Sequence, residues 1–264
     1  MEHSFNSIVI KNQSIGFIGG GRITRIFLQA FTNAGVSFDS IAVFDINPEV
    51  TSKLKKAYPQ VTITNMEEAS AQPIVFLALH PPVLMEFLSN QSVSINESII
   101  VSLAPKITIA KIASVLNNEQ IVRMIPNATS YINEGYNPIT FADSINADLK
   151  ASVLNLLKPL GKTIEVAEKK LEAYAILSAM LPTYFWFQWN KSEAIGVEMG
   201  MTPEESKETL KNTLIGAIHL LYDSNLPFEG VNDLIPVKPI AEHQSQIEEI
   251  YQTKLLGLFD KIKP

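Results

Sequence analysis

Short apolar runs rich in β-branched residues alternate with amphipathic stretches through the first 166 residues of the chain. Several of these runs are apolar at nearly every position, which is typical of strands covered on both faces by helices. The runs predict strands at 14–18, 41–44, 74–79, 99–103, 121–125, 137–141 and 163–166. The stretches between them predict helices at 22–33, 48–57, 82–88, 109–116 and 148–157. This alternation predicts an α/β fold with a mostly parallel sheet.

The pattern changes after Val166 and becomes entirely helical. Residues 167–199 read as one long helix, rich in Leu, Ala and aromatic residues, with a kink at Pro182. The segment 202–205, Thr-Pro-Glu-Glu, has the spacing of a capping box and predicts the start of a new helix. A proline-containing loop and a final helix at 241–261 follow. We therefore expect two domains, an α/β domain over residues 1–166 and an all-α domain over residues 167–264.

Composition and charge narrow the class of protein. The 264 residues carry a net charge of −6, which argues against nucleic acid as a partner because phosphate binding requires basic residues. No apolar run approaches the roughly 20 residues that a membrane-spanning helix needs, so we expect no membrane role. The chain has no cysteine, its four histidines lack metal-ligand spacing, and residues 1–11 lack the pattern of an export signal. A cytoplasmic protein without a metal site is expected.

A glycine-rich turn follows the first predicted strand and opens the first predicted helix. The sequence GFIGGGRIT at 16–24 matches the first two glycines of the dinucleotide-binding fingerprint and has Thr24 where the third would stand, which loosens the match. Such a turn lets the backbone approach a pyrophosphate at a helix N-terminus. The alternative is an ordinary turn. The residues expected to bind the cofactor here are Gly19, Gly20, Gly21, Arg22 and Ile23.

Polar residues follow other strand ends. Asp45 ends the second predicted strand, where a carboxylate binds the adenosine ribose and repels a 2′-phosphate. It favours NAD over NADP, although the nearby Lys53, Lys55 and Lys56 keep NADP open; otherwise Asp45 is a solvated strand end or a helix cap. Ala78 lies at the end of the third run, 74–79, and His80 follows it. Both are further candidates for the cofactor crevice, with a surface histidine as the alternative for His80.

With these residues located, the chain resembles the pyrroline-5-carboxylate reductase family from about residue 14 to about residue 221. The opening at 16–23 resembles the family's GFIGAGNM, and 78–81 stands where relatives read AVKP. Residues 100–104 resemble VVSIAAG, with Pro105 replacing the glycine, and 121–127 resembles RVMPN. Glu168 and the segment 171–173 match an acid and the LDA-like start of the long helix.

The resemblance implies a Rossmann domain, followed by a helical domain through which subunits form homodimers or higher assemblies. It implies reduction of the small molecule 1-pyrroline-5-carboxylate to L-proline with a nicotinamide cofactor. Asn127 would lie near the nicotinamide, although a turn-forming asparagine is the alternative. Glu168 would assist proton delivery, although it also reads as a first-turn helix acid. Ser178 would face the substrate, although such hydroxyls usually bond a backbone carbonyl.

Departures from the family pattern concentrate at the substrate site. The family's TALSGSGPAY becomes AILSAMLPTY at 175–184, so that Met180 and Leu181 occupy positions where relatives have small residues. The SPGGTT loop that grips the substrate carboxylate has no counterpart at 233–239, where Lys238 is the only cation. Two alternatives therefore stay open: a cofactor-binding regulatory protein that has lost reductase activity, and a hydroxyacid or F420-type oxidoreductase sharing the N-terminal domain.

Overall fold

The computed structural model describes residues 13–89, 95, 98–116 and 118–264. The expectation about an export signal concerns residues 1–11, which lie outside the described residues. Among the described residues, no helix is both long and apolar enough to cross a membrane.

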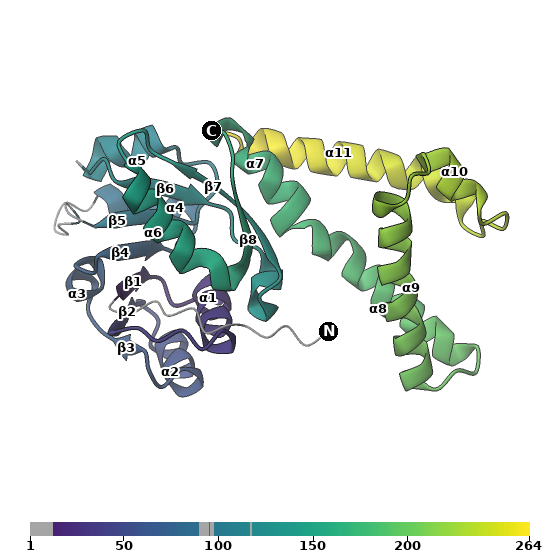
Figure 1. Cartoon of the computed structure of the whole chain (residues 1–264), viewed down its shortest axis with the longest axis horizontal. Helices are drawn as coiled ribbons and strands as arrows, with labels where there is room; N and C mark the ends of the chain where they lie inside the picture. The colour runs from purple at the N-terminus through teal and green to yellow at the C-terminus, as the bar shows by residue number, and fades with distance from the viewer. Residues whose placement is uncertain (1–12, 90–94, 96–97, 117) are drawn as a thin grey trace. The chain divides into compact units, whose positions relative to one another are not determined.

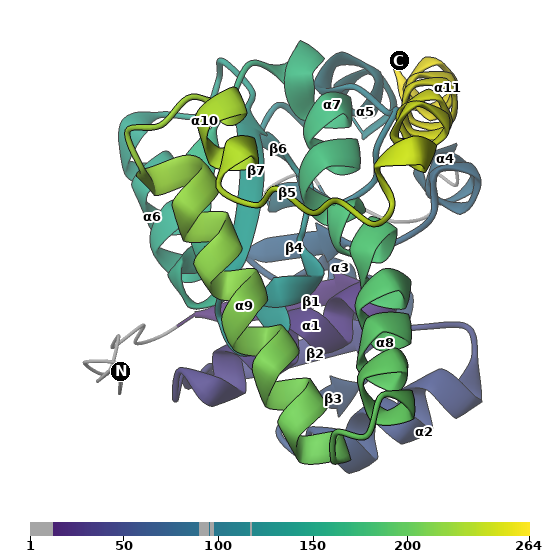
Figure 2. The same cartoon turned by 90° about the vertical axis from the view of Figure 1, so that its right-hand side faces the viewer.

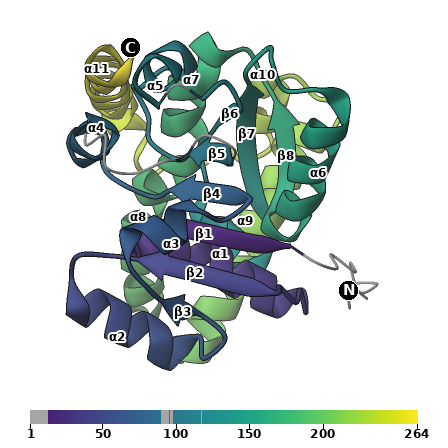
Figure 3. The same ribbon diagram turned by 90° about the vertical axis from the view of Figure 1, so that its left-hand side faces the viewer.

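A single eight-stranded sheet organises the first part of the chain, with strand order β3-β2-β1-β4-β5-β6-β7-β8 (Figures 1 and 3). Pairing is parallel throughout except between β6 and β7. The strands are β1 (Ser14–Ile18), β2 (Ser40–Phe44), β3 (Thr62–Ile63), β4 (Ile74–Leu77), β5 (Ile99–Ser102), β6 (Ile121–Met124), β7 (Gly135–Phe141) and β8 (Gly161–Glu165). The predicted parallel α/β fold is confirmed. Only β3 was not expected, because two residues show no periodicity.

Apolar side chains cover both faces of the sheet. On one face, Phe27 and Phe31 of α1 (Arg22–Asn33) pack with Phe17 and Phe76 from the strands, and α6 (Ala147–Leu157) covers the same face. The other face packs against the helices α3 (Met66–Ser70), α4 (Pro81–Ser89) and α5 (Ile109–Leu116). A further predicted helix is α2 (Pro48–Ala57). The order in which the strands are added reverses between β1 and β4, because β2 and β3 lie on one side of this point and the later strands on the other. Such a switch point leaves a crevice at the carboxyl ends of the parallel strands.

The segment 167–199 is helical along most of its length, but it is not one continuous helix, and its break lies beside Pro182, where a kink is predicted. The segment contains a 3₁₀ turn (Glu168–Lys170), α7 (Leu171–Tyr174), a π-helical turn (Ala175–Ala179) and α8 (Leu181–Glu198). Pro182 lies in the first turn of α8, and a proline has no amide to donate and clashes with the carbonyl four residues earlier. That carbonyl belongs to Ser178, where it accepts a hydrogen bond from the Asn127 side chain instead. The chain therefore widens into a π-turn and starts a new helix.

Contacts divide the chain into two compact units, one ending at Ala179 and including Phe259–Pro264, the other spanning Met180–Leu258. The boundary between the two units therefore lies later in the chain than Val166, where the sequence pattern becomes helical. Residues 167–179 stay with the sheet because Glu168 and Glu172 pair with Arg123 of β6.

The second unit is helical and has almost no interior of its own. It contains α8, α9 (Pro203–Asp223), the short α10 (Phe228–Asp233), which was not predicted, and most of α11 (Gln244–Ile262) (Figure 2). The capping box at the start of α9 is confirmed, with Thr202 and Glu205 bonded reciprocally. Within residues 180–258, all of them described, only Gly196 and Ser206 are buried.

Candidate functional site

The turn between β1 and α1 requires glycine at its first position. Gly19 has φ +103°, a conformation that other residues rarely adopt, and a Cβ there would lie 2.6 Å from the Ala78 carbonyl oxygen. The Gly19 amide donates to the Phe44 carbonyl at 2.8 Å, and the Ala78 amide donates to Ile18 at 2.9 Å. The turn is thereby fixed between the ends of β2 and β4.

Open space lies in front of the α1 N-terminus. Gly21 is the N-cap of this helix, no side chain caps it, and a Cβ at Gly21 would meet no atom within 4 Å. Arg22 beside it is exposed, and Ile23 is half-buried against the apolar core. No acidic residue stands in the first turn. The uncapped amides and the helix dipole therefore favour an anionic ligand.

Thr24 secures the turn. Its Oγ1 donates a hydrogen bond of 2.6 Å to the Gly19 carbonyl, and its side chain is fully buried. Thr24 departs from the glycine fingerprint, but its hydroxyl ties the first helical turn back to Gly19.

Asp45 stands directly after β2 and faces the glycine turn. Its Oδ2 accepts a hydrogen bond of 2.7 Å from the Gly20 amide, and its Oδ1 accepts one of 2.8 Å from the Asn47 amide. The cap of α2 is Asn47, whose side chain accepts from the Glu49 amide, so the alternative in which Asp45 caps this helix is wrong. Asp45 joins the end of β2 to the glycine turn.

A cavity of about 320 Å³ adjoins both Gly19 and Asp45. Its lining is mostly apolar, and its remaining members are Ile18, Phe44, Ile46, Met66, Leu79, Val83, Glu86 and Phe87. Ile46 is 85% exposed, which is unusual for an apolar residue that follows a buried strand. Sequence reasoning missed these lining residues, although an isoleucine directly after the strand-end acid was the available signal. The cavity has the size and mixed lining of a small-molecule pocket.

The candidate histidine does not line this cavity. His80 is exposed and is not among the cavity's lining residues. Its carbonyl accepts a hydrogen bond of 2.8 Å from the Leu84 amide in the first turn of α4. This position agrees with the alternative interpretation of His80 as a surface histidine.

Asn127 and Ser178, far apart in the sequence, are hydrogen-bonded to each other. The Asn127 Nδ2 donates to Ser178 Oγ at 3.0 Å and to the Ser178 carbonyl at 3.1 Å, while Asn127 Oδ1 accepts from the Thr129 amide. Ser178 Oγ donates to the Tyr136 carbonyl at 2.7 Å. Both side chains are buried and fully paired. They hold the π-turn against the segment after β6. The bond from the Thr129 amide is the one expected of a turn-forming asparagine, which is the alternative interpretation of Asn127.

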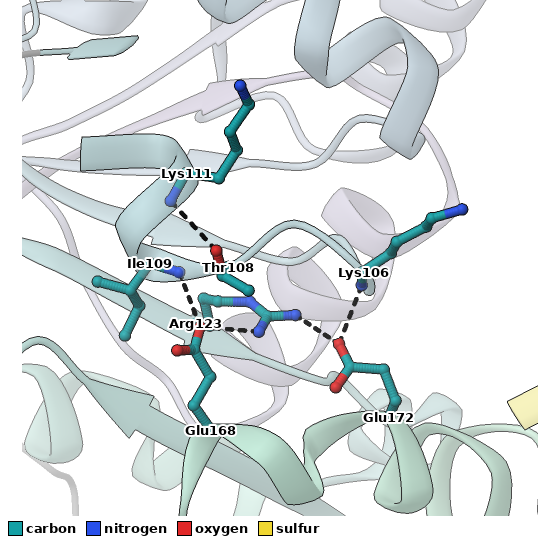
Figure 4. A network of polar contacts seen from close by, with 7 residues as sticks. All are labelled: Lys106, Thr108, Ile109, Lys111, Arg123, Glu168 and Glu172. Carbon is teal, nitrogen blue, oxygen red and sulfur yellow. Dashed lines mark hydrogen bonds and ion pairs between the residues drawn. The ribbon is translucent and has the colours of Figure 1, made fainter. Parts of the chain in front are cut away.

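Glu168 belongs to a network around a buried arginine (Figure 4). The Arg123 guanidinium, whose side chain is 1% exposed, contacts Glu168 Oε1 at 2.9 Å and Glu172 Oε1 at 2.7 Å. The same oxygens accept the backbone amides of Ile109 at 2.7 Å and Lys106 at 2.9 Å respectively. Sequence reasoning singled out Glu168 but not Arg123 or Glu172. A charged residue within an apolar strand was the signal that could have found Arg123.

A glycine turn facing a helix N-terminus, an acid at the end of β2 and an adjoining cavity fit a bound dinucleotide. These features define a Rossmann-type dinucleotide-binding domain. In agreement, residues 14–106 match the family model described as NADP oxidoreductase coenzyme F420-dependent.

Comparisons along the whole chain give a more specific answer. The chain is 25% identical to pyrroline-5-carboxylate reductase of Corynebacterium melassecola over 93% of both chains, and 23% identical to that of Escherichia coli over 84% of both. The fold matches a Plasmodium falciparum pyrroline carboxylate reductase solved with NADP bound, at a TM-score of 0.76, 19% identity and 95% coverage of both chains. Along most of its length the chain is thus similar to pyrroline-5-carboxylate reductases, and the solved structure shows that it shares their fold.

The hydroxyl of Thr24 can be tested by substitution. Thr24→Val keeps the side chain's shape but removes the donor, and leaving the buried Gly19 carbonyl without this partner should cost roughly 1–3 kcal/mol of stability. The measurement is the free energy of unfolding in urea. Thr24→Ser is the control: it keeps the hydroxyl and loses one methyl, worth about 0.8 kcal/mol. A Val variant as stable as the wild type would show that the bond contributes nothing.

Proposed function

We propose that this protein is an NAD(P)H-dependent reductase of the pyrroline-5-carboxylate reductase type, acting on a small cyclic imine. The observation that carries the proposal is the constrained turn at Gly19, which opens on an uncapped helix N-terminus beside Asp45 and the cavity. The family relationship, which extends over nearly the whole chain, supports the same activity. Since the chain has no cysteine, we also propose the reducing cytoplasm as its location.

In this proposal the uncapped amides at the N-terminus of α1 bind the pyrophosphate, and Asp45 accepts from the adenosine ribose hydroxyls. The apolar lining of the cavity, with exposed Ile46, packs against the adenine. When bound, the reduced nicotinamide supplies a hydride. Asn127 and Ser178 fix the backbone beside it through their mutual hydrogen bonds. Glu168, whose side chain is 31% exposed, is the residue that this proposal assigns to proton delivery to the product nitrogen.

The activity is tested by following nicotinamide absorbance with 1-pyrroline-5-carboxylate and with a panel of cyclic imines and 2-oxo acids. Oxidation of NADH or NADPH with one of these substrates is expected. Tight nucleotide binding without turnover on the whole panel would contradict the reductase and favour the second candidate, a cofactor-binding regulatory protein. The observation favouring that candidate is the π-turn followed by Met180 and Leu181, which replaces the small-residue segment of relatives.

Asp45 should set the preference for NADH over NADPH. A carboxylate at this position repels a 2′-phosphate, so Asp45→Asn should lower the Kd for NADPH on the order of tenfold and change that for NADH less. The matched control is Asp39→Asn, which removes the same charge from the exposed residue preceding β2 at the opposite end of the strand. Calorimetric titration gives both constants. Equal NADPH affinities in the wild type and Asp45→Asn would contradict this role.

We also propose self-association through the second unit, in the form of a homodimer or a higher assembly. This unit exposes large apolar side chains, including Phe187 at 68%, Tyr222 at 76% and Val237 at 73%, and a compact domain needs such surface covered. Phe187 lies on α8, and Trp186 beside it on this helix is also exposed.

Light scattering should therefore give a mass that is a multiple of 29.2 kDa. Phe187→Glu should shift the protein toward monomer, because a charge cannot be buried unpaired in an apolar interface. Asn190→Glu, at an exposed polar position of α8, is the control and should keep the wild-type mass. A monomeric wild type would reject self-association.

A further inference from the structure

Lys106 has a backbone conformation that lysine rarely adopts. Its φ is +74°, and among the described residues the only other non-glycine residue with positive φ is Asn133. Asparagine tolerates this region because its short side chain bonds locally, whereas lysine has no such compensation. Strained backbone of this kind persists only where the surroundings over-determine it, and it concentrates at functional sites.

A buried ionic network holds the strained residue. The Lys106 amide donates to Glu172 Oε1, which is also paired with Arg123. Both Glu172 and Arg123 have side chains that are 1% exposed. Figure 4 shows the guanidinium lying between the two carboxylates, each of which also reaches the segment between β5 and α5.

The second carboxylate fixes the other end of the same segment. Glu168 Oε1 accepts from the Ile109 amide, which begins α5. The backbone from Lys106 to Ile109 is therefore held at two amides by carboxylates that share one arginine. Because Arg123 comes from the neighbouring strand β6, the position of this segment is fixed relative to the sheet rather than by its own loop alone.

The segment lies at the carboxyl ends of the central strands. Arg123 is in register with Ser102, the last residue of β5, and Ser102 is in register with Leu77 at the end of β4. Asp45 marks the adenosine side, since it follows β2 on the other side of β1. A dinucleotide that crosses the glycine turn from Asp45 therefore brings its nicotinamide half to the ends of β4 and β5.

We propose that Arg123, Glu172 and Glu168 are positioning residues, which hold Lys106 in the left-handed conformation so that the backbone after β5 fits the nicotinamide half of the cofactor. The proposal rests on the proposed cofactor binding. It assigns the affinity for this half to the conformation of Lys106 and not to the charge of its ammonium group.

A matched pair of substitutions at Lys106 separates conformation from charge. Lys106→Gly and Lys106→Val both remove the ammonium, but glycine adopts positive φ freely and valine resists it strongly. Lys106 is exposed, so neither change disturbs the core. Binding is measured by calorimetry with NADH and with ADP-ribose, which lacks the nicotinamide.

Lys106→Gly should bind NADH as the wild type does, and Lys106→Val should bind it on the order of tenfold more weakly. ADP-ribose should bind all three proteins alike. Equal losses in both variants would assign the effect to charge and overturn the proposal. So would wild-type NADH affinity in the valine variant, or a parallel loss of ADP-ribose affinity.

Substitution of Glu172 provides a second test, by rescue. Glu172→Met removes the acceptor for the Lys106 amide, whereas Glu172→Gln keeps an oxygen there. Glu172→Met should lose affinity for NADH but not for ADP-ribose, and Glu172→Gln should lose less affinity for NADH. Adding Lys106→Gly to the Glu172→Met variant should restore much of the lost NADH affinity. No recovery in the double variant would overturn the proposal. A wild type that binds neither NADH nor ADP-ribose would instead reject the proposed cofactor function itself, and this inference with it.

Discussion

The close approach of two strand ends determines the geometry of the candidate cofactor site. Gly19 and the Ala78 carbonyl lie so near each other that a Cβ at Gly19 would come within 2.6 Å of that oxygen. The approach fixes the direction of the chain as it leaves β1, and hence the point at which the N-terminus of α1 meets the crevice. Thr24 and Asp45 bind the same turn: the Thr24 hydroxyl donates to the Gly19 carbonyl, and the Asp45 carboxylate accepts from the Gly20 amide. The candidate pyrophosphate site is thus a consequence of how β1, β2 and β4 pack.

Elements with local signals could be predicted from the sequence. The parallel sheet follows from continuous apolar runs, and the α9 capping box follows from the spacing of Thr202 and Glu205. The glycine turn was recognisable because its residues adjoin in sequence. The π-turn was not, because it depends on a contact between Asn127 and Ser178 across the fold and on the missing amide of Pro182.

Tertiary networks set the limit of sequence reasoning at the candidate site. Glu168 reads as an ordinary first-turn helix acid, and only the structure shows that it shares Arg123 with Glu172 and caps α5 at Ile109. The cavity shows the same limit. Its lining residues come from β1, β2, α3, α4 and the loops between them, and no period along the chain links them. A long-range set of this kind becomes visible only when the strand order is known.

Energetics indicate what the buried network contributes. A buried ion pair rarely stabilises a fold more than apolar residues of similar size would, because desolvation offsets the attraction. Here the desolvation cost is not fully compensated, since among the described residues the buried Arg123 Nε and Glu172 Oε2 make no hydrogen bond. Stability alone therefore gives little reason for two carboxylates around one guanidinium. Their bonds to the amides of Lys106 and Ile109 give a reason, because an acceptor at a fixed point can hold a backbone conformation that the chain would otherwise leave.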